Sequence, residues 1–221
     1  MVAQSQQPKA RSPMIDLPLF PLPNVVLFPG VFLPLHVFEP RYRDMVADAL
    51  QGDRLIGMTL LQPGWQADYE GRPPVYSIGC SGVITHVERL PDGRYNLVLR
   101  GLDRFRIVSE DHTRSYRRAQ VDLLRDPPLD QTGCRQLYQC RQRLESLVDT
   151  KGTRQASYRQ PGMTDTDYVH AVAQYMELEP LEKQALLAID TITGRAESLV
   201  DLVEMRQWMA RAPHGGSRLA H

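Results

Sequence analysis

Hydrophobic and polar residues alternate with a period of two over much of residues 17–124, a pattern typical of half-buried β-strands. Proline and glycine interrupt the alternation and predict the turns between strands. The pattern predicts strands over residues 17–22, 25–28, 31–37, 55–61, 77–89, 95–100, 105–108 and 119–124. Pro34 in the third strand indicates a sheet edge or a bend. Gly93 and Gly101 are expected to supply turns between the later strands.

One helix is expected among these strands. Pro40 suits the first helical position, and apolar residues then repeat at helical spacing until Gly52 ends the helix. After the stiff sequence Asp-Pro-Pro at 126–128 the hydrophobic period lengthens to about 3.5 residues, which predicts helices. Thr164 is expected to cap one helix, Pro180 to begin another, and Asp190 or Thr193 to cap the last. An α+β fold follows, with a flexible segment at 1–13, a β-barrel subdomain at 14–125, a helical bundle at 126–211 and a disordered tail at 212–221.

Prolines are concentrated near the start of the chain, where eight of the 17 lie within the first 40 residues. Residues 17–38 carry no charge, so a hydropathy scan would propose a membrane helix or an export signal there. Five prolines and Gly30 would each remove or strain a helical hydrogen bond that hydrocarbon cannot replace. We therefore expect strand breaks and turns, and no membrane partner.

Composition and motifs limit the kinds of functional site that the chain can contain. The 26 basic and 26 acidic side chains cancel, and the three cysteines form no C-x-x-C pair, which favours a reducing, cytoplasmic location without disulfides. The chain has no P-loop motif and no G-x-S-x-G motif, and its six histidines lack zinc-ligand spacing. The sequence therefore predicts no enzyme, no metal site and no cofactor, although a hydrolase site assembled from scattered residues stays open.

Two sets of residues are candidates for binding. The long loop at 62–74 carries Trp65 and Tyr69, and large aromatics in exposed loops often anchor peptides. Phe32 and Tyr76 are expected to be their neighbours, and ordinary packing of the loop is the competing interpretation. A second set is a basic cluster near aromatics that could bind RNA, and it comprises Arg100, Arg104, Arg106, Arg117 and Arg118. Nearby acidic residues favour a solvated strand face instead.

Several segments resemble one known family. They are LPLFPLPNVVLFPG at 17–30, LPL at 33–35, FEPRY at 38–42, IGC at 78–80, LPDGRY at 90–95, GLDRFRI at 101–107 and EKQALL at 182–187. In these sequences the chain resembles the amino-terminal substrate-binding domain of Lon proteases, over about residues 14 to 210. Residues 151–163 do not align with the family pattern.

The resemblance implies a PUA-like mixed β-barrel followed by a helical bundle, in a stand-alone form without the ATPase and protease domains. It implies a non-enzymatic module that recognises unfolded or degron-bearing polypeptide, in protein quality control or in proteolysis by a separate protease. The groove would be lined by barrel loops or by the junction with the bundle. RNA binding is the alternative, because PUA-like barrels of other families bind RNA. The family supplies no catalytic residues to place on this sequence.

Overall fold

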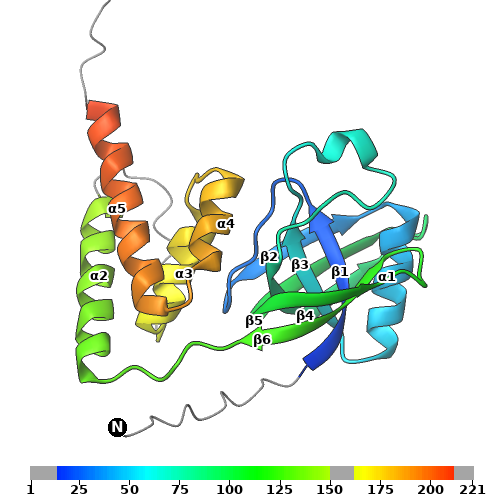
Figure 1. Cartoon of the computed structure of the whole chain (residues 1–221), viewed down its shortest axis with the longest axis horizontal. Coiled ribbons are helices and arrows are strands. Elements are labelled where there is room, and N and C mark those ends of the chain that lie inside the picture. The colour runs from blue at the N-terminus through cyan, green and yellow to red at the C-terminus, as the bar shows by residue number, and fades with distance from the viewer. Residues whose placement is uncertain (1–13, 150–161, 212–221) are drawn as a thin grey trace, which may run out of the picture. The chain divides into compact units, whose positions relative to one another are not determined.

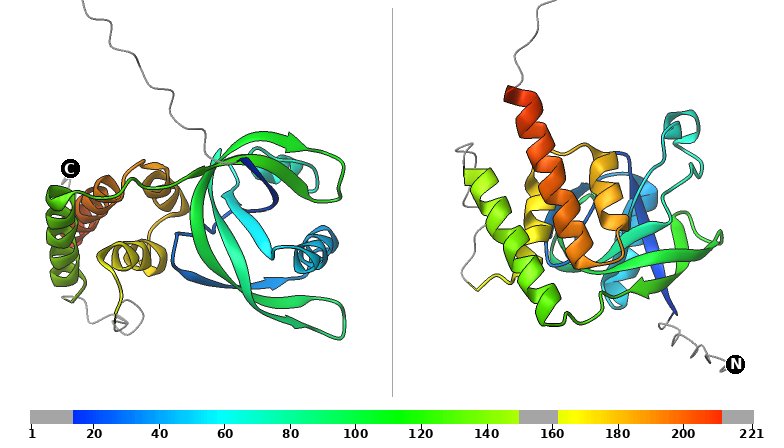
Figure 2. Two further views of the ribbon diagram at one scale, coloured as in Figure 1. Left: turned by 90° about the horizontal axis from the view of Figure 1, so that it is seen from below. Right: turned by 60° about the vertical axis from the view of Figure 1, so that its left-hand side comes forward.

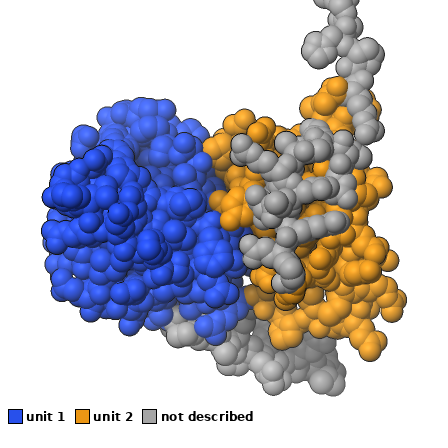
Figure 3. All heavy atoms as spheres, turned by 180° about the vertical axis from the view of Figure 1, so that it is seen from behind, with its two compact units in different colours: residues 1–125 blue, residues 126–221 orange. Residues whose placement is uncertain are grey.

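The computed structural model describes residues 14–149 and 162–211. It divides into two compact units, Met1–Arg125 and Asp126–His221, which Figure 3 colours separately. We call them the sheet unit and the helical unit. The flexible segment expected at 1–13, the tail expected at 212–221 and residues 151–161 of the unaligned stretch lie outside the described residues.

The sheet unit contains six strands, one α-helix and one 3-10 helix (Figure 1). These are β1 (Met14–Leu22), β2 (Phe32–Val37), α1 (Pro40–Gln51), β3 (Leu55–Leu60), η1 (Trp65–Asp68), β4 (Ile78–Arg89), β5 (Tyr95–Asp111) and β6 (Arg117–Leu124). The strand order is β2-β5-β4-β3-β1-β6, and β5 also pairs with β6. The sheet therefore closes on itself as a barrel of five strands, with β2 added at the edge.

The length of β5 makes this closure possible. Its 17 residues pair with β2 through the first part of the strand and with β6 through the last part. Register shifts in the β4–β5 pairing, between Cys80 and Gly82 and between Ile84 and His86, mark bulges. Bulges bend a strand and increase its twist, which lets the sheet curl. Of the described strand pairs, only β1 and β3 run parallel, so the sheet is mixed. Figure 2 shows how the strands curl around one another.

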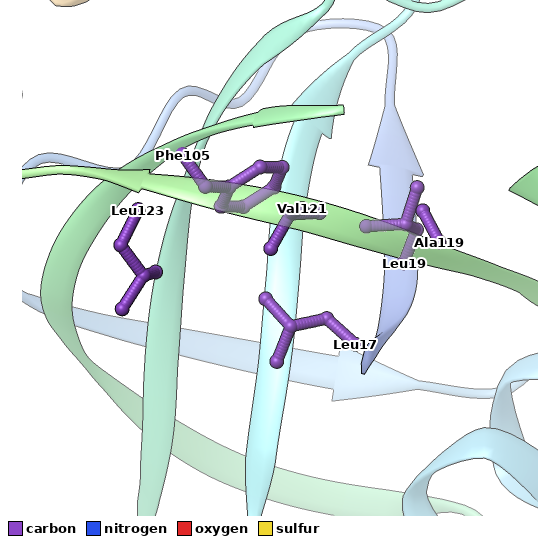
Figure 4. Close-up of a cluster of buried hydrophobic side chains, with 6 residues drawn as sticks. All are labelled: Leu17, Leu19, Phe105, Ala119, Val121 and Leu123. Atoms are coloured by element: carbon purple, nitrogen blue, oxygen red, sulfur yellow. The ribbon is translucent and has the colours of Figure 1, made fainter. Parts of the chain in front are cut away.

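Apolar side chains from β1, β5 and β6 fill the barrel. Every second side chain of a strand lies on the same face. The alternation over residues 119–124 predicted this for Ala119, Val121 and Leu123. Figure 4 shows the resulting cluster, which comprises Leu17, Leu19, Phe105, Ala119, Val121 and Leu123. We call it the barrel core. The helix α1 buries a separate face against the sheet, where the ring centroids of Phe20 and Tyr42 lie 4.6 Å apart.

One strand prediction and one turn prediction were wrong. The segment 25–28 is not a strand, although Val26, Leu27 and Phe28 are buried. Gly101 lies inside β5 and makes no turn. The two corrections share a cause, since a Cβ atom at Gly101 would lie 2.1 Å from the carbonyl oxygen of Phe28. Glycine is required there so that the two backbones can approach, whereas Gly93 does occupy a turn, with φ of 83°.

The helical unit contains α2 (Gln131–Asp149), α3 (Asp165–Tyr175), α4 (Pro180–Ala188) and α5 (Ile192–Arg211). Thr164 caps α3 in a capping box with Asp167, and Pro180 begins α4, as the sequence predicted. The cap expected at Asp190 or Thr193 is instead Thr191, whose Oγ1 accepts a hydrogen bond of 3.2 Å from the Gly194 amide. With strands in one unit and helices in the other, the fold is α+β. In the described part of the chain, each helix is too short or too polar to span a bilayer.

Candidate functional site

The loop between β3 and β4 is held closed by its own backbone. The amide of Gln62 donates to the carbonyl oxygen of Pro74 at 2.8 Å, and its side-chain amide donates to that of Val75 at 2.9 Å. Gly64 takes a left-handed φ of 88° immediately before η1. The long loop noted in the sequence is therefore a folded structure.

The start of α1 fastens this loop to the barrel. The guanidinium of Arg41 donates to the carbonyl oxygens of Tyr69 at 3.1 Å and Gly71 at 3.5 Å, and it lies 3.0 Å from a carboxylate oxygen of Glu39. The Tyr69 hydroxyl donates to the same carboxylate at 2.5 Å. Burial and this hydrogen bond raise the pKa of Tyr69. Because Pro40 fixes the first turn of α1, Glu39 and Arg41 are positioned together to hold the loop.

A cavity of about 150 Å³ lies beside this attachment, and we call it the loop cavity. It lies where the second half of the loop, the start of α1 and the start of β6 meet. It is lined by Pro21, Arg41, Tyr42, Leu61, Tyr69, Glu70, Gly71, Arg72, Pro73, Ser115, Tyr116 and Arg117. Apolar, aromatic and cationic groups thus share one small enclosure, which is the usual composition of a ligand site.

Three of the lining residues are arginines, and Arg117 is the most deeply placed, with 7% of its surface exposed. Its Nη2 donates to the Pro73 carbonyl oxygen at 2.7 Å, and its Nε lies 3.7 Å from a carboxylate oxygen of Glu110. Its Nη1 is buried and has no hydrogen-bond partner among the described residues. Burial lowers the pKa of Arg117; Glu110 opposes this, and the charges of Arg72 and Arg41 add to it.

Arg72 extends the positive charge toward the opposite side of the loop. Its guanidinium donates to the carbonyl oxygens of Asp111 at 3.3 Å and Arg114 at 3.2 Å. These carbonyl oxygens are neutral, so neither hydrogen bond cancels the charge of the guanidinium. The cavity therefore offers guanidinium donors as well as an apolar wall.

Two buried tyrosines complete the lining. Burial raises the pKa of Tyr42 to about 12, and burial together with Asp48 raises that of Tyr116 to about 12. The Tyr116 hydroxyl donates to the Asp48 carboxylate at 2.6 Å. Both side chains therefore stay neutral at physiological pH, and they add hydrogen-bonding capacity to the cavity without adding charge.

The structure brings together two of the four aromatic residues predicted to bind peptide. Tyr69 lines the cavity, and its ring centroid lies 5.3 Å from that of Trp65. Phe32 is 44% exposed on the edge strand β2, where it pairs with Arg100 of β5. The half-buried Tyr76 follows the loop, and its amide donates to the Leu60 carbonyl oxygen at 2.9 Å. Neither of these two belongs to the cavity lining.

The alternative basic surface is divided by the fold. Arg104 is 2% exposed and Arg117 is 7% exposed, so these two residues do not lie on an exposed strand face. A phosphate backbone contacts exposed cations, and these two residues are buried. Arg118 is half-buried and forms an ion pair with Asp16. Only Arg100 and Arg106 of the five are exposed.

Sequence reasoning missed Arg41, Arg72 and Tyr42, because the loop, α1 and β6 meet only in three dimensions. One signal for Arg117 was present, since it is in phase with Ala119 and the other inward-facing residues of β6. Among the described residues, no group of three His, Cys, Asp or Glu side chains is placed to hold a metal ion.

The chain is similar in sequence to one domain of Lon proteases. The model of the ATP-dependent protease La (LON) substrate-binding domain matches residues 16–205. The Lon protease of Cytophaga hutchinsonii is 25% identical over 207 residues, covering 91% of this chain and 25% of that protein. That of Roseiflexus castenholzii is 29% identical over 199 residues, covering 85% and 24%. The chain therefore spans about a quarter of the length of these curated relatives.

Solved structures give a consistent result. The N-terminal domain of a Mycobacterium avium complex Lon protease superimposes with a TM-score of 0.68 at 16% identity, covering 86% of this chain and 98% of that one. A Lon N-terminal domain protein from Xanthomonas campestris superimposes with a TM-score of 0.59 at 26% identity, covering 85% and 98%. The first of these similarities bears on the fold alone.

Proposed function

The chain belongs to the family of the ATP-dependent protease La (LON) substrate-binding domain, and from that premise we propose that its sheet unit binds unfolded or degron-bearing polypeptide at the loop cavity. The binding is non-catalytic and supplies substrates for proteolysis. The observation that carries the proposal is the folded loop, which holds Tyr69 and Trp65 beside a cavity with apolar and cationic walls. Such a surface can take both the side chains and the polar groups of an extended chain.

The proposal assigns different roles to the two loop aromatics. Tyr69 forms part of the cavity wall and is fixed by Glu39, so it acts as a preorganised contact. Trp65 is half-buried against Tyr69 and extends the aromatic surface beyond the cavity. Rigid aromatics of this kind supply contact area at a low cost in conformational entropy.

A cytoplasmic location belongs to the same proposal. Cys80, Cys134 and Cys140 are free thiols in the structure. Free thiols persist in reducing compartments, where unfolded proteins are also cleared by proteolysis.

The test uses a permanently unfolded protein, reduced and carbamidomethylated α-lactalbumin, with binding followed by fluorescence anisotropy. We expect saturable binding by the wild type and at least tenfold weaker binding by Trp65→Ala, with circular dichroism confirming that the variant is folded. Trp208→Ala is the matched control, because Trp208 is 71% exposed in the helical unit. It should bind as the wild type does.

Equal binding by the wild type and Trp65→Ala would contradict the assignment of the site. Weakening by Trp208→Ala alone would move the site to the helical unit. Absence of binding by the wild type would remove the proposed function altogether.

A further inference from the structure

The three arginines of the loop cavity differ in how completely they are hydrogen-bonded. Arg41 is neutralised by Glu39, which also accepts the Tyr69 hydroxyl. Arg117 has only a distant partner, with Glu110 3.7 Å from its Nε, and its Nη1 has no hydrogen-bond partner among the described residues. Among the described residues, the guanidinium of Arg72 donates to the carbonyl oxygens of Asp111 and Arg114 and to no carboxylate. Glu70 also lines the cavity, so with Glu39 and Glu110 the carboxylates equal the arginines in number. Among the described residues, the buried Nη1 of Arg117 is nevertheless left without an acceptor.

The buried position of Arg117 makes its unsatisfied nitrogen destabilising. Arg117 lies directly opposite Leu19 across the β1–β6 pairing, and it precedes Ala119 on the inward face of β6. A charge taken out of water is destabilising unless it is paired and fully hydrogen-bonded. A buried guanidinium with one unsatisfied nitrogen is accounted for if a ligand completes its hydrogen bonds.

Guanidinium chemistry indicates what that ligand is. The N–H groups of arginine form a planar fork that matches two oxygens of a carboxylate. The cavity is small, about 150 Å³, and its other walls include Pro21, Leu61 and Tyr69. These walls suit the aliphatic part of an amino acid, whereas a hydrated phosphate would gain nothing from them.

We propose that the loop cavity recognises a carboxylate of the bound polypeptide, held by Arg117 and Arg72. The proposal rests on the proposed function, since it names the chemical group that the same site selects. The carboxylate comes from a free C-terminus or from an Asp or Glu side chain. Polypeptides that present neither group inside an apolar context should bind weakly.

The experiment compares three BODIPY-labelled hexapeptides that differ only at the end of the chain. All contain Gly-Ser-Ala-Leu-Ala; the first ends in Leu with a free acid, the second in Leu amide, and the third in Asp amide. We expect at least one acidic peptide to bind tenfold or more tightly than the Leu amide, by fluorescence anisotropy. Preference for the first identifies a C-terminal carboxylate, and preference for the third identifies a side chain.

Arg72→Gln is the main variant, because Arg72 is half-buried and its loss should not unfold the barrel. It should lose the preference for the acidic peptides. Arg106→Gln is the matched control, since it removes one exposed arginine outside the cavity lining and should keep the preference. Acetate and inorganic phosphate are added as competitors, and acetate should displace the peptide at least as well as phosphate.

Three results would overturn the proposal. They are equal binding of all three peptides, a preference that survives Arg72→Gln, and displacement by phosphate but not by acetate. The binding assay with unfolded α-lactalbumin distinguishes failure of the carboxylate proposal from failure of the proposed function. If the wild type binds unfolded α-lactalbumin but shows no preference among the peptides, the proposed function stands and the carboxylate proposal fails.

Discussion

The barrel core and the loop cavity lie next to each other on the same strands, yet they are built from opposite chemistry. On β6 the inward-facing residues Ala119, Val121 and Leu123 belong to the barrel core (Figure 4), and Arg117 continues their row into the cavity. On β1 the row passes from Leu19 to Pro21 in the same way. A single pattern of alternation thus builds a hydrophobic interior and then a cationic site.

The barrel core stabilises the fold, whereas the loop cavity is assigned to binding. Apolar side chains in the barrel core contribute to stability in proportion to the area removed from water. Arg117 is buried at a cost, with an incompletely bonded guanidinium. The comparison therefore predicts that changes in the core alter stability, whereas changes at the cavity alter binding.

Phe105→Ala should have the largest effect on stability, because Phe105 is fully buried in the barrel core. The cavity left by its ring should lower the free energy of unfolding by about 3–5 kcal/mol. Urea titration measures this through the fluorescence of Trp65, in a Trp208→Phe background so that the signal comes from the sheet unit.

The matched control is Val108→Ala, because Val108 lies on the same strand and is 52% exposed. It should change the free energy of unfolding by less than about 0.5 kcal/mol. Equal losses for the two variants would contradict the assignment of the barrel core.

Alkaline pH should destabilise the cavity end of the sheet unit. Burial raises the pKa of Tyr42 to about 12, from 10 in the unfolded chain. Its contribution is therefore complete below pH 10 and is lost as the pH rises toward 12, because the unfolded state releases its proton first. Allowing for screening by solvent, the loss should be about 2 kcal/mol across this window.

Urea titrations at pH 9 and at pH 11 measure this loss. The free energy of unfolding of Tyr42→Phe should fall less between these two pH values, since phenylalanine has no proton to release. An identical pH dependence in the wild type and in Tyr42→Phe would show that another group is responsible.

Arg117→Met should separate binding from stability. Methionine keeps an unbranched apolar stem, although it is shorter than arginine, and it removes a buried, incompletely paired charge, so the free energy of unfolding should change by no more than about 1 kcal/mol. Affinity for the acidic hexapeptide should fall at least tenfold in the anisotropy assay. A variant that loses stability and keeps its affinity would reverse the roles assigned to the core and the cavity.

Tyr69→Phe should have the smallest effect. It removes the hydrogen bond to Glu39 and should cost about 1 kcal/mol of stability. The aromatic ring is kept, so affinity for unfolded α-lactalbumin should fall less than threefold. A loss as large as that of Trp65→Ala would show that the attachment of the loop, and not aromatic contact, determines binding.

Local patterns predicted much of the fold. Alternation over 119–124 placed Ala119, Val121 and Leu123 on one face, and this is the face that fills the barrel. The capping box of Thr164 and Asp167 was readable because its two residues are three apart. Such features depend on neighbours in the chain, and so they can be read from sequence.

The loop cavity could not be read in the same way. It joins residues about 20 to 100 positions apart, such as Pro21, Tyr42 and Arg117, through the β1–β6 register and the start of α1. Gly101 was misread for the same reason, since the strand that it occupies is approached by Phe28 from a distant segment. The aromatic candidates Trp65 and Tyr69 were brought together because they lie four residues apart, at the two ends of η1.

The most direct test of a carboxylate in the loop cavity is nuclear magnetic resonance of the arginine side chains. The Nε–H signals of Arg117 and Arg72, assigned with Arg117→Met and Arg72→Gln, are followed while the acidic and amide hexapeptides are titrated. The account predicts that both signals shift with the acidic peptide, saturate at the affinity found by anisotropy, and do not shift with the Leu amide. Shifts of equal size with both peptides, or shifts confined to arginines outside the cavity, would contradict it.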